Sequence, residues 1–214
     1  MSNTGERSNG FAMAIVVEGG LGLVALVLAW IFGVSLREQL ADPGVPLAWA
    51  VVRGVAVTLP MLAVFWWLVH SSRPALRRLR EQVEWLLGEM FPSAGIAQLA
   101  LVAALAGVGE ELLFRGFLQN LIGRWTTPIV GLVVASLLFG FAHALSKLYF
   151  AFATLIGLCF GWLTFEYNDL VAPMVAHGLY DFVALAYLTR GIAKRNLRQP
   201  LDDSTAEAEG NDGE

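Results

Sequence analysis

Long apolar runs follow one another along this chain, separated by short polar stretches. Six runs are long enough to span a membrane, at about 11–35, 46–70, 94–124, 128–146, 148–166 and 170–189. A membrane-spanning helix needs about 20 mostly apolar residues, and a soluble core of this size cannot bury several such runs. The pattern predicts an all-α fold, a polytopic transmembrane helical bundle of about six spans, with a kink at Pro60.

The segment between the second and third runs has a different pattern. Its apolar residues recur at helical spacing, at Leu76, Leu79, Val83, Leu86 and Leu87, with charged residues between them. This spacing predicts an amphipathic helix lying on the membrane surface.

The chain divides by these patterns into three segments. Residues 1–93 hold the first two spans and the surface helix, and residues 94–190 hold a core of four spans. Residues 191–214 form an acidic tail, in which six of the 18 acidic residues of the chain lie between 202 and 214. A charged segment without aromatic residues is predicted to be disordered.

Composition supports a membrane protein and gives no indication of a nucleic-acid-binding one. Hydrophobic residues make up 57% of the chain and charged residues 15%, against about 45–50% and about 25% in soluble domains. The basic residues flank the apolar runs and are not interleaved with exposed aromatic residues, so we expect no nucleic-acid partner. The one cysteine cannot form an intramolecular disulfide.

The basic residues also predict the orientation. In the six-span topology, ten of the 14 Lys and Arg residues, Arg7 among them, fall on the side that carries both ends of the chain. Positively charged segments stay in the cytoplasm, so both termini are expected there. The first run is longer than the apolar core of a signal peptide and is expected to remain as a helix.

Three of the runs carry ionisable residues at membrane depth, which is energetically costly and indicates function. They are Glu110, Glu111 and Arg115 in the third run, His143 in the fourth (after Phe139), and His177 and Asp181 in the sixth. The i, i+4 spacing of Glu111 and Arg115 favours an ion pair. Glu110 points about 100° away around the helix. It lacks that partner and is the candidate general base.

Depth estimates support a common site for two of these residues. Glu110 and His143 each lie about sixteen residues from the expected turn at Thr126–Thr127, or roughly 25 Å along their helices. His177 fits less well, at roughly 13 Å from its own turn. Glu18 and Arg53 are expected near opposite interfaces, where each side chain extends separately towards water.

The motifs Glu110-Glu111-x-x-x-Arg115, Phe139-x-x-x-His143 and His177-x-x-x-Asp181, in this order on separate helices, resemble those of the CPBP family of intramembrane proteases. That family includes the CAAX prenyl endopeptidases of the Ras-converting-enzyme type and bacterial Abi, or bacteriocin-immunity, relatives. The resemblance covers roughly residues 95–190. It implies a helical bundle with a cavity open to the cytosol and the lipid.

The resemblance also implies roles for the residues. Glu110 and His143 would activate the attacking water, and His177 and Asp181 would stabilise the oxyanion. The family usually has Asn at the last position, whose amide can donate a hydrogen bond, whereas an ionised Asp only accepts. We therefore expect Asp181 to orient His177 or stay protonated, so that His177 carries most of the oxyanion stabilisation. Glu111, Arg115 and Phe139 are the expected structural and orienting residues.

Cofactor use and function remain open between alternatives at this point. A metal-free mechanism is preferred, with a zinc site of Glu110, His143 and His177 as the alternative. The preferred function is an endopeptidase that acts on a membrane-associated protein or peptide, in the cytoplasmic (plasma) membrane of a bacterium. One rival is a proton-coupled transporter with Glu110 and the histidines as a relay. The other is an immunity-type membrane protein with little activity.

Overall fold

The computed structural model describes residues 9–40 and 46–210, without the side chains of Asn9 and of residues 193–210. Every element in these ranges is helical, which confirms the all-α prediction. The helices are α1 (Asn9–Ile31), α2 (Arg37–Leu40), α3 (Leu47–His70), α4 (Pro74–Met90), α5 (Ile96–Glu111), the π-helix η2 (Leu112–Gln119), α6 (Asn120–Trp125), α7 (Pro128–Ala142), α8 (Lys147–Tyr167) and α9 (Val171–Gly210).

Five helical stretches in the described residues are long and apolar enough to cross a membrane. They are Gly10–Ile31, Leu47–His70, Ile96–Trp125, Lys147–Tyr167 and Val171–Ile192. The fourth predicted span, 128–146, is shorter than expected, because α7 has 15 residues and ends at Ala142. Large apolar side chains point outward, such as Trp30 at 83% exposure. This inside-out pattern suits a bundle whose surface faces lipid.

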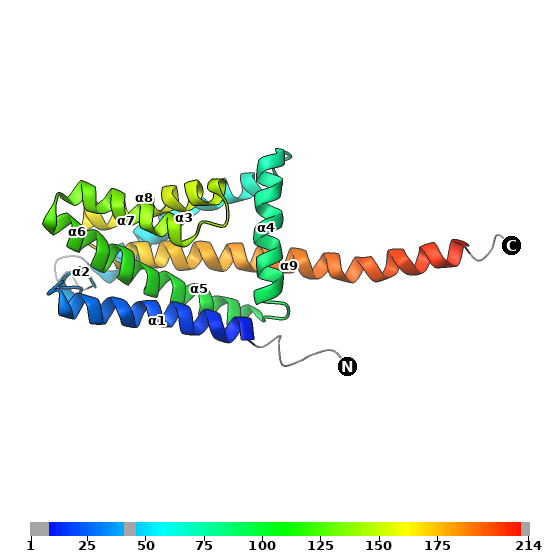
Figure 1. Ribbon diagram of the computed structural model, residues 1–214, viewed down its shortest axis with the longest axis horizontal. Coiled ribbons are helices and arrows are strands. Elements are labelled where there is room, and N and C mark those ends of the chain that lie inside the picture. The colour runs from blue at the N-terminus through cyan, green and yellow to red at the C-terminus, as the bar shows by residue number, and fades with distance from the viewer. Residues whose placement is uncertain (1–8, 41–45, 211–214) are drawn as a thin grey trace.

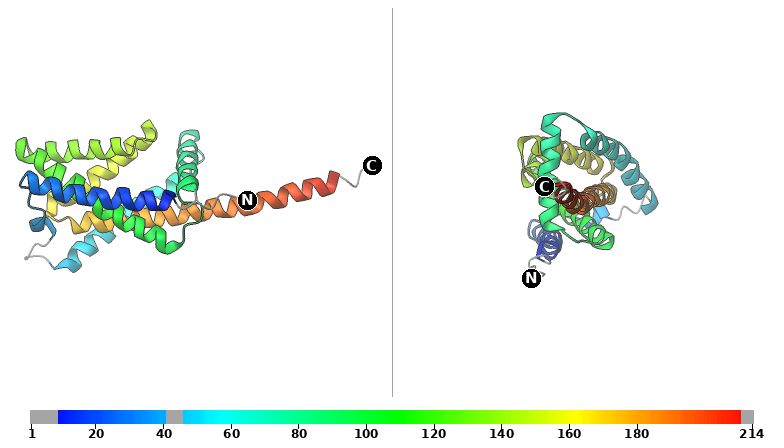
Figure 2. Two further views of the ribbon diagram at one scale, coloured as in Figure 1. Left: turned by 60° about the horizontal axis from the view of Figure 1, so that its bottom comes forward. Right: turned by 90° about the vertical axis from the view of Figure 1, so that its right-hand side faces the viewer.

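The long helices run alongside one another, and α4 crosses their ends (Figure 1; end-on in Figure 2, right). The buried residues of α4 are Leu76, Leu79 and Leu87, so the predicted amphipathic helix forms with its apolar stripe turned inward. Leu87 belongs to a cluster with Phe65 of α3, Leu99 of α5 and Leu188 of α9. This cluster fastens α4 to the bundle. Its position at a membrane surface stays a prediction.

The third span is continuous but changes its helical type. Residues Leu112–Gln119 form a π-helix between α5 and α6. Directly after this stretch, the side-chain amide of Asn120 in α6 donates to the carbonyls of Arg115 and Gly116, both at 3.0 Å. Bonding from i to i+5 fits more residues into each turn than an α-helix does, and such segments are frequent at functional sites.

Glycines allow the helices around the site to approach closely. A Cβ on Gly107 of α5 would lie 2.8 Å from the backbone nitrogen of Gly178 in α9. A Cβ on Gly157 of α8 would lie 3.3 Å from Arg115 Nη2 and 3.2 Å from Cα of Ser136 in α7. A methyl group at Gly107 would force the helices apart and one at Gly157 would be tightly confined, as expected for small residues between membrane helices.

The last helix continues past the bundle (Figure 1). Its bounds, Val171–Gly210, include most of the segment predicted to be a disordered tail. Arg7 and the last four residues of that tail lie outside the described residues. Disorder of the tail and the division into three segments stay predictions.

Candidate active site

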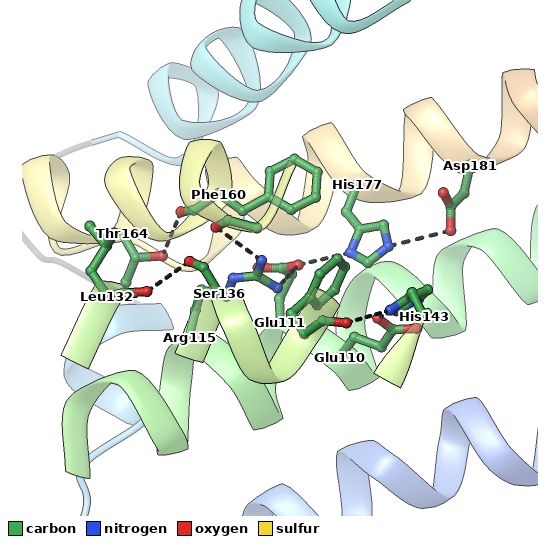
Figure 3. Close-up of polar contacts among 12 residues, drawn as sticks. Glu110, Glu111, Arg115, Leu132, Ser136, His143, Phe160, Thr164, His177 and Asp181 are labelled. Atoms are coloured by element: carbon green, nitrogen blue, oxygen red, sulfur yellow. Dashed lines mark hydrogen bonds and ion pairs between the residues drawn. The ribbon is translucent and has the colours of Figure 1, made fainter. Parts of the chain in front are cut away.

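The ionisable residues of the three motifs meet in one cluster (Figure 3). Glu110 and Glu111 are the last residues of α5, His143 follows the end of α7, and His177 and Asp181 lie on α9. Nε2 of His143 lies 3.5 Å from Oε2 of Glu110. The side chain of Glu110 is 7% exposed, against 27% for His143. The expected base is thus buried beside a histidine that is partly open to the outside.

Phe139 fixes the orientation of His143. Its backbone carbonyl lies 2.9 Å from Nδ1 of His143. A carbonyl only accepts hydrogen bonds, so the contact needs a proton on Nδ1. A neutral imidazole then presents a bare Nε2 to Glu110. The Phe139 ring also stacks on His143, with centroids 4.5 Å apart.

Glu111 anchors the other half of the cluster. Its Oε1 accepts a hydrogen bond from Arg115 Nη1 at 2.8 Å and lies 2.8 Å from Nδ1 of His177. Arg115 also donates from Nη2 to the carbonyl of Gly157 at 3.1 Å. Glu111 and Arg115 are fully buried. The predicted ion pair therefore forms and also holds a histidine.

Aromatic rings enclose this buried pair. The Arg115 guanidinium lies 4.3 Å from the ring centroid of Phe139 and 5.3 Å from that of Phe160. Phe160 also stacks on His177, with centroids 5.1 Å apart. Cations are attracted to ring faces, so both phenylalanines stabilise the positive groups of the cluster. The orienting role expected of Phe139 stays a prediction, and its contacts with Arg115 and His143 support it.

His177 and Asp181 interact as their i, i+4 spacing predicted. Nε2 of His177 lies 3.3 Å from Oδ2 of Asp181. The His177 side chain is 4% exposed and that of Asp181 30% exposed. Each ring nitrogen of His177 therefore faces a carboxylate oxygen, one fully buried and one near the surface.

The depth mismatch expected for His177 was wrong. The estimate used the α-helical rise throughout the third span, whereas eight of its residues are in the π-helix. A π-helix fits more residues into each turn, so it places Glu110 and Glu111 nearer to the turn and accounts for part of the difference. His177 contacts Glu111, while Glu110 contacts His143.

Sequence reasoning missed two residues of the site. Phe160 carried no signal, because an aromatic residue in an apolar run is ordinary. Glu18 did carry one, an acid within the first span. The expectation that it extends alone towards water was wrong, since its side chain lies within hydrogen-bonding reach of Glu110.

The geometry does not fit the alternative zinc site. Both ring nitrogens of His177 already face carboxylates, at 2.8 Å and 3.3 Å. Nδ1 of His143 is bound to a backbone carbonyl. Within residues 9–40 and 46–210, no three His, Cys, Asp or Glu side chains are arranged to hold a metal ion. Glu110, His143 and His177 do not converge as three ligands with an open position would.

Comparison with known proteins singles out the same part of the chain. The model of the family described as Type II CAAX prenyl endopeptidase Rce1-like matches residues 92–183, which contain all the site residues above except Glu18. The uncharacterized protein YpbD of Bacillus subtilis (strain 168) is 36% identical over 98 residues, or 44% of this chain and 48% of that protein. The chain thus spans about half the length of this relative.

No solved structure matches the chain. The resemblance predicted from the three motifs is nevertheless confirmed for the segment that contains them. With five helices in the described residues long enough to span a bilayer, the chain is an integral membrane protein, and its residues 92–183 are similar to a family of membrane proteases.

Proposed function

We propose that this chain is an intramembrane endopeptidase. The match of residues 92–183 to the Rce1-like CAAX prenyl endopeptidases supports this proposal. The observation that carries the proposal is the pair Glu110 and His143, 3.5 Å apart and enclosed by apolar helices. A carboxylate and an imidazole at this separation can both reach one water molecule at hydrogen-bond length.

Glu110 and His143 divide the activation of water between them. Bare Nε2 of His143 and the Glu110 carboxylate both accept hydrogen bonds from the water. As its oxygen attacks the peptide carbonyl carbon, Glu110 takes the proton and later returns it to the leaving amine nitrogen. Because Phe139 holds Nδ1 of His143 at 2.9 Å, the imidazole needs no rearrangement before attack.

His177 stabilises the negative charge on the carbonyl oxygen. Its Nδ1 is held by the buried Glu111 at 2.8 Å, while its Nε2 faces the more exposed Asp181 at the longer distance of 3.3 Å. The developing oxyanion replaces Asp181 as the partner of Nε2. A preorganised donor aimed at developing charge is worth about 10²–10³ in rate.

The substrate is a membrane-associated protein or peptide. His143 and Asp181, the most exposed of the motif residues, mark the side from which the peptide enters. We propose a bacterial cytoplasmic membrane with both termini in the cytoplasm, since most of the basic residues lie on that side.

A cleavage assay in proteoliposomes tests the function. The probes are a fluorescence-quenched peptide ending in a farnesylated Cys-aliphatic-aliphatic-X motif, the same peptide without the farnesyl group, and a quenched transmembrane peptide. We expect cleavage of at least one probe, located by mass spectrometry. Failure to cleave any of them by folded protein would leave the transporter or immunity-protein interpretation in place.

Chelation provides a separate prediction about the mechanism. After dialysis of the purified protein against a strong chelator, we expect the cleavage rate to stay unchanged, because Glu110 and His143 activate water directly. Metal analysis should find well under one zinc per chain. The mechanism would be overturned if zinc co-purified at about one ion per chain, if its removal abolished activity and if its return restored activity. The protease function would still stand.

A further inference from the structure

Glu18 lies in α1, outside the segment that matches the protease family. It is the only acidic residue of that helix in the described chain, surrounded by apolar and glycine residues. An acid placed within an apolar span is costly unless it serves a purpose. The residues around Glu18 indicate what its carboxyl group does.

A glycine contact between α1 and α5 determines where Glu18 lies. A Cβ on Gly22 would lie 3.4 Å from Cα of Gly109, and a Cβ on Gly109 would collide with the backbone oxygen of Glu18. The two helices therefore touch backbone to backbone at Gly109. Glu18 lies one helical turn before Gly22, and Glu110 directly follows Gly109, so the crossing brings the two acids together.

The two carboxyl groups need a proton between them. They lie within hydrogen-bonding reach of each other, and Glu18 also experiences the charges of Asp181 and His143. In each of the two acids, Oε2 is buried and accepts no hydrogen bond from the described residues. Two ionised carboxylates repel at such range in a low-dielectric site. A proton shared by the pair removes the repulsion and supplies the missing donor.

We propose that Glu18 is a positioning residue for the hydrolytic reaction, donating a carboxyl hydrogen bond that holds the Glu110 carboxylate against His143. This inference rests on the proposed protease function. Glu18 keeps its proton throughout. The proton taken from water goes to Glu110 and then to the leaving amine, which returns the pair to its starting state.

Two substitutions separate a hydrogen-bonding role from a packing role. Glu18→Gln keeps a donor of the same shape, so we expect kcat close to that of the wild type. Glu18→Leu suits an apolar helix but has no donor, and kcat should fall about 10–100-fold, the worth of one hydrogen bond to a charged group. KM should stay unchanged, because Glu18 does not touch the substrate. Glu166→Leu, the same change at an exposed site in α8, is the control.

The kinetic result can contradict the inference without affecting the function. If the wild type cleaves a probe and Glu18→Leu is as fast as Glu18→Gln, Glu18 has no positioning role. Equal losses in both variants would likewise overturn the donor assignment. A wild type that cleaves no probe would instead remove the proposed function itself.

Infrared spectroscopy tests the pair without relying on activity. The wild type should show a carbonyl-stretching band of a protonated carboxyl group that is absent from Glu18→Gln, because the amide makes the shared proton unnecessary. This measurement does not need the Glu18→Leu variant, so it tests the inference even if that variant does not fold. Identical spectra of the two proteins in this region would overturn the inference.

Discussion

Replacement of Glu110 by glutamine is expected to lower the rate of peptide cleavage by about 10²–10⁴-fold, the usual contribution of a general base. Glutamine has nearly the same shape and keeps an oxygen 3.5 Å from His143, but it cannot take a proton from water. Packing is conserved, so the melting temperature in detergent should change little. The loss should appear in kcat with every probe that the wild type cleaves.

Two companion variants make this result specific. His143→Ala should show a similar loss, because it removes the other group that contacts the water. Glu166→Gln, a change at an exposed carboxylate of α8, should retain the wild-type rate. A Glu110→Gln protein that cleaves at the wild-type rate would show that Glu110 is not the base.

The residues within each motif could be paired from the sequence because helical spacing is local. The i, i+4 rule identified Glu111 with Arg115 and His177 with Asp181, and the structure has both contacts. The same rule separated Glu110 from Glu111, since neighbouring residues point about 100° apart on a helix. Family resemblance then connected the three motifs, which spacing alone could not do.

Contacts between helices were predicted less completely, because they depend on crossing geometry. Gly157 and Gly107 are positions of close approach between helices, and a small residue alone does not say which helix lies opposite it. The sequence did not identify the crossing of α1 and α5 at Gly109. Glu18 was expected to lie apart from the other acids, but this crossing places it beside Glu110. The π-helix was also missed, because Leu112–Gln119 is apolar at positions that suit an ordinary α-helix.

The end of α7 shows how local capping overrides an apolar pattern. Hydrophobicity extended the fourth span to residue 146, but the helix ends at Ala142. His143 caps it, and Ser146 begins α8 by accepting a hydrogen bond from the backbone nitrogen of Tyr149. The early end leaves His143 at a loop junction, where its Nε2 can face Glu110. The short helix therefore contributes to the site.

Replacement of Glu111 by alanine is expected to act on stability first, and so to differ from Glu110→Gln. Glu111 is fully buried, and its Oε1 contacts both Arg115 Nη1 and His177 Nδ1 at 2.8 Å. Without it, the fully buried Arg115 guanidinium loses the carboxylate that it contacts and is left against a backbone carbonyl and aromatic faces. An unpaired buried charge of this kind costs about 3–5 kcal/mol.

The protein carries its own control for this prediction. Arg77 and Glu81 form an i, i+4 pair on α4 at 3.8 Å, with side chains 60% and 59% exposed. Exposed pairs contribute about 0–1 kcal/mol, so Glu81→Ala should melt at nearly the wild-type temperature, whereas Glu111→Ala should melt well below it or express poorly. A structural anion cannot be removed from beside a buried guanidinium without loss of stability. Therefore, if Glu111→Ala melts like the wild type and is inactive, Glu111 rather than Glu110 acts as the base.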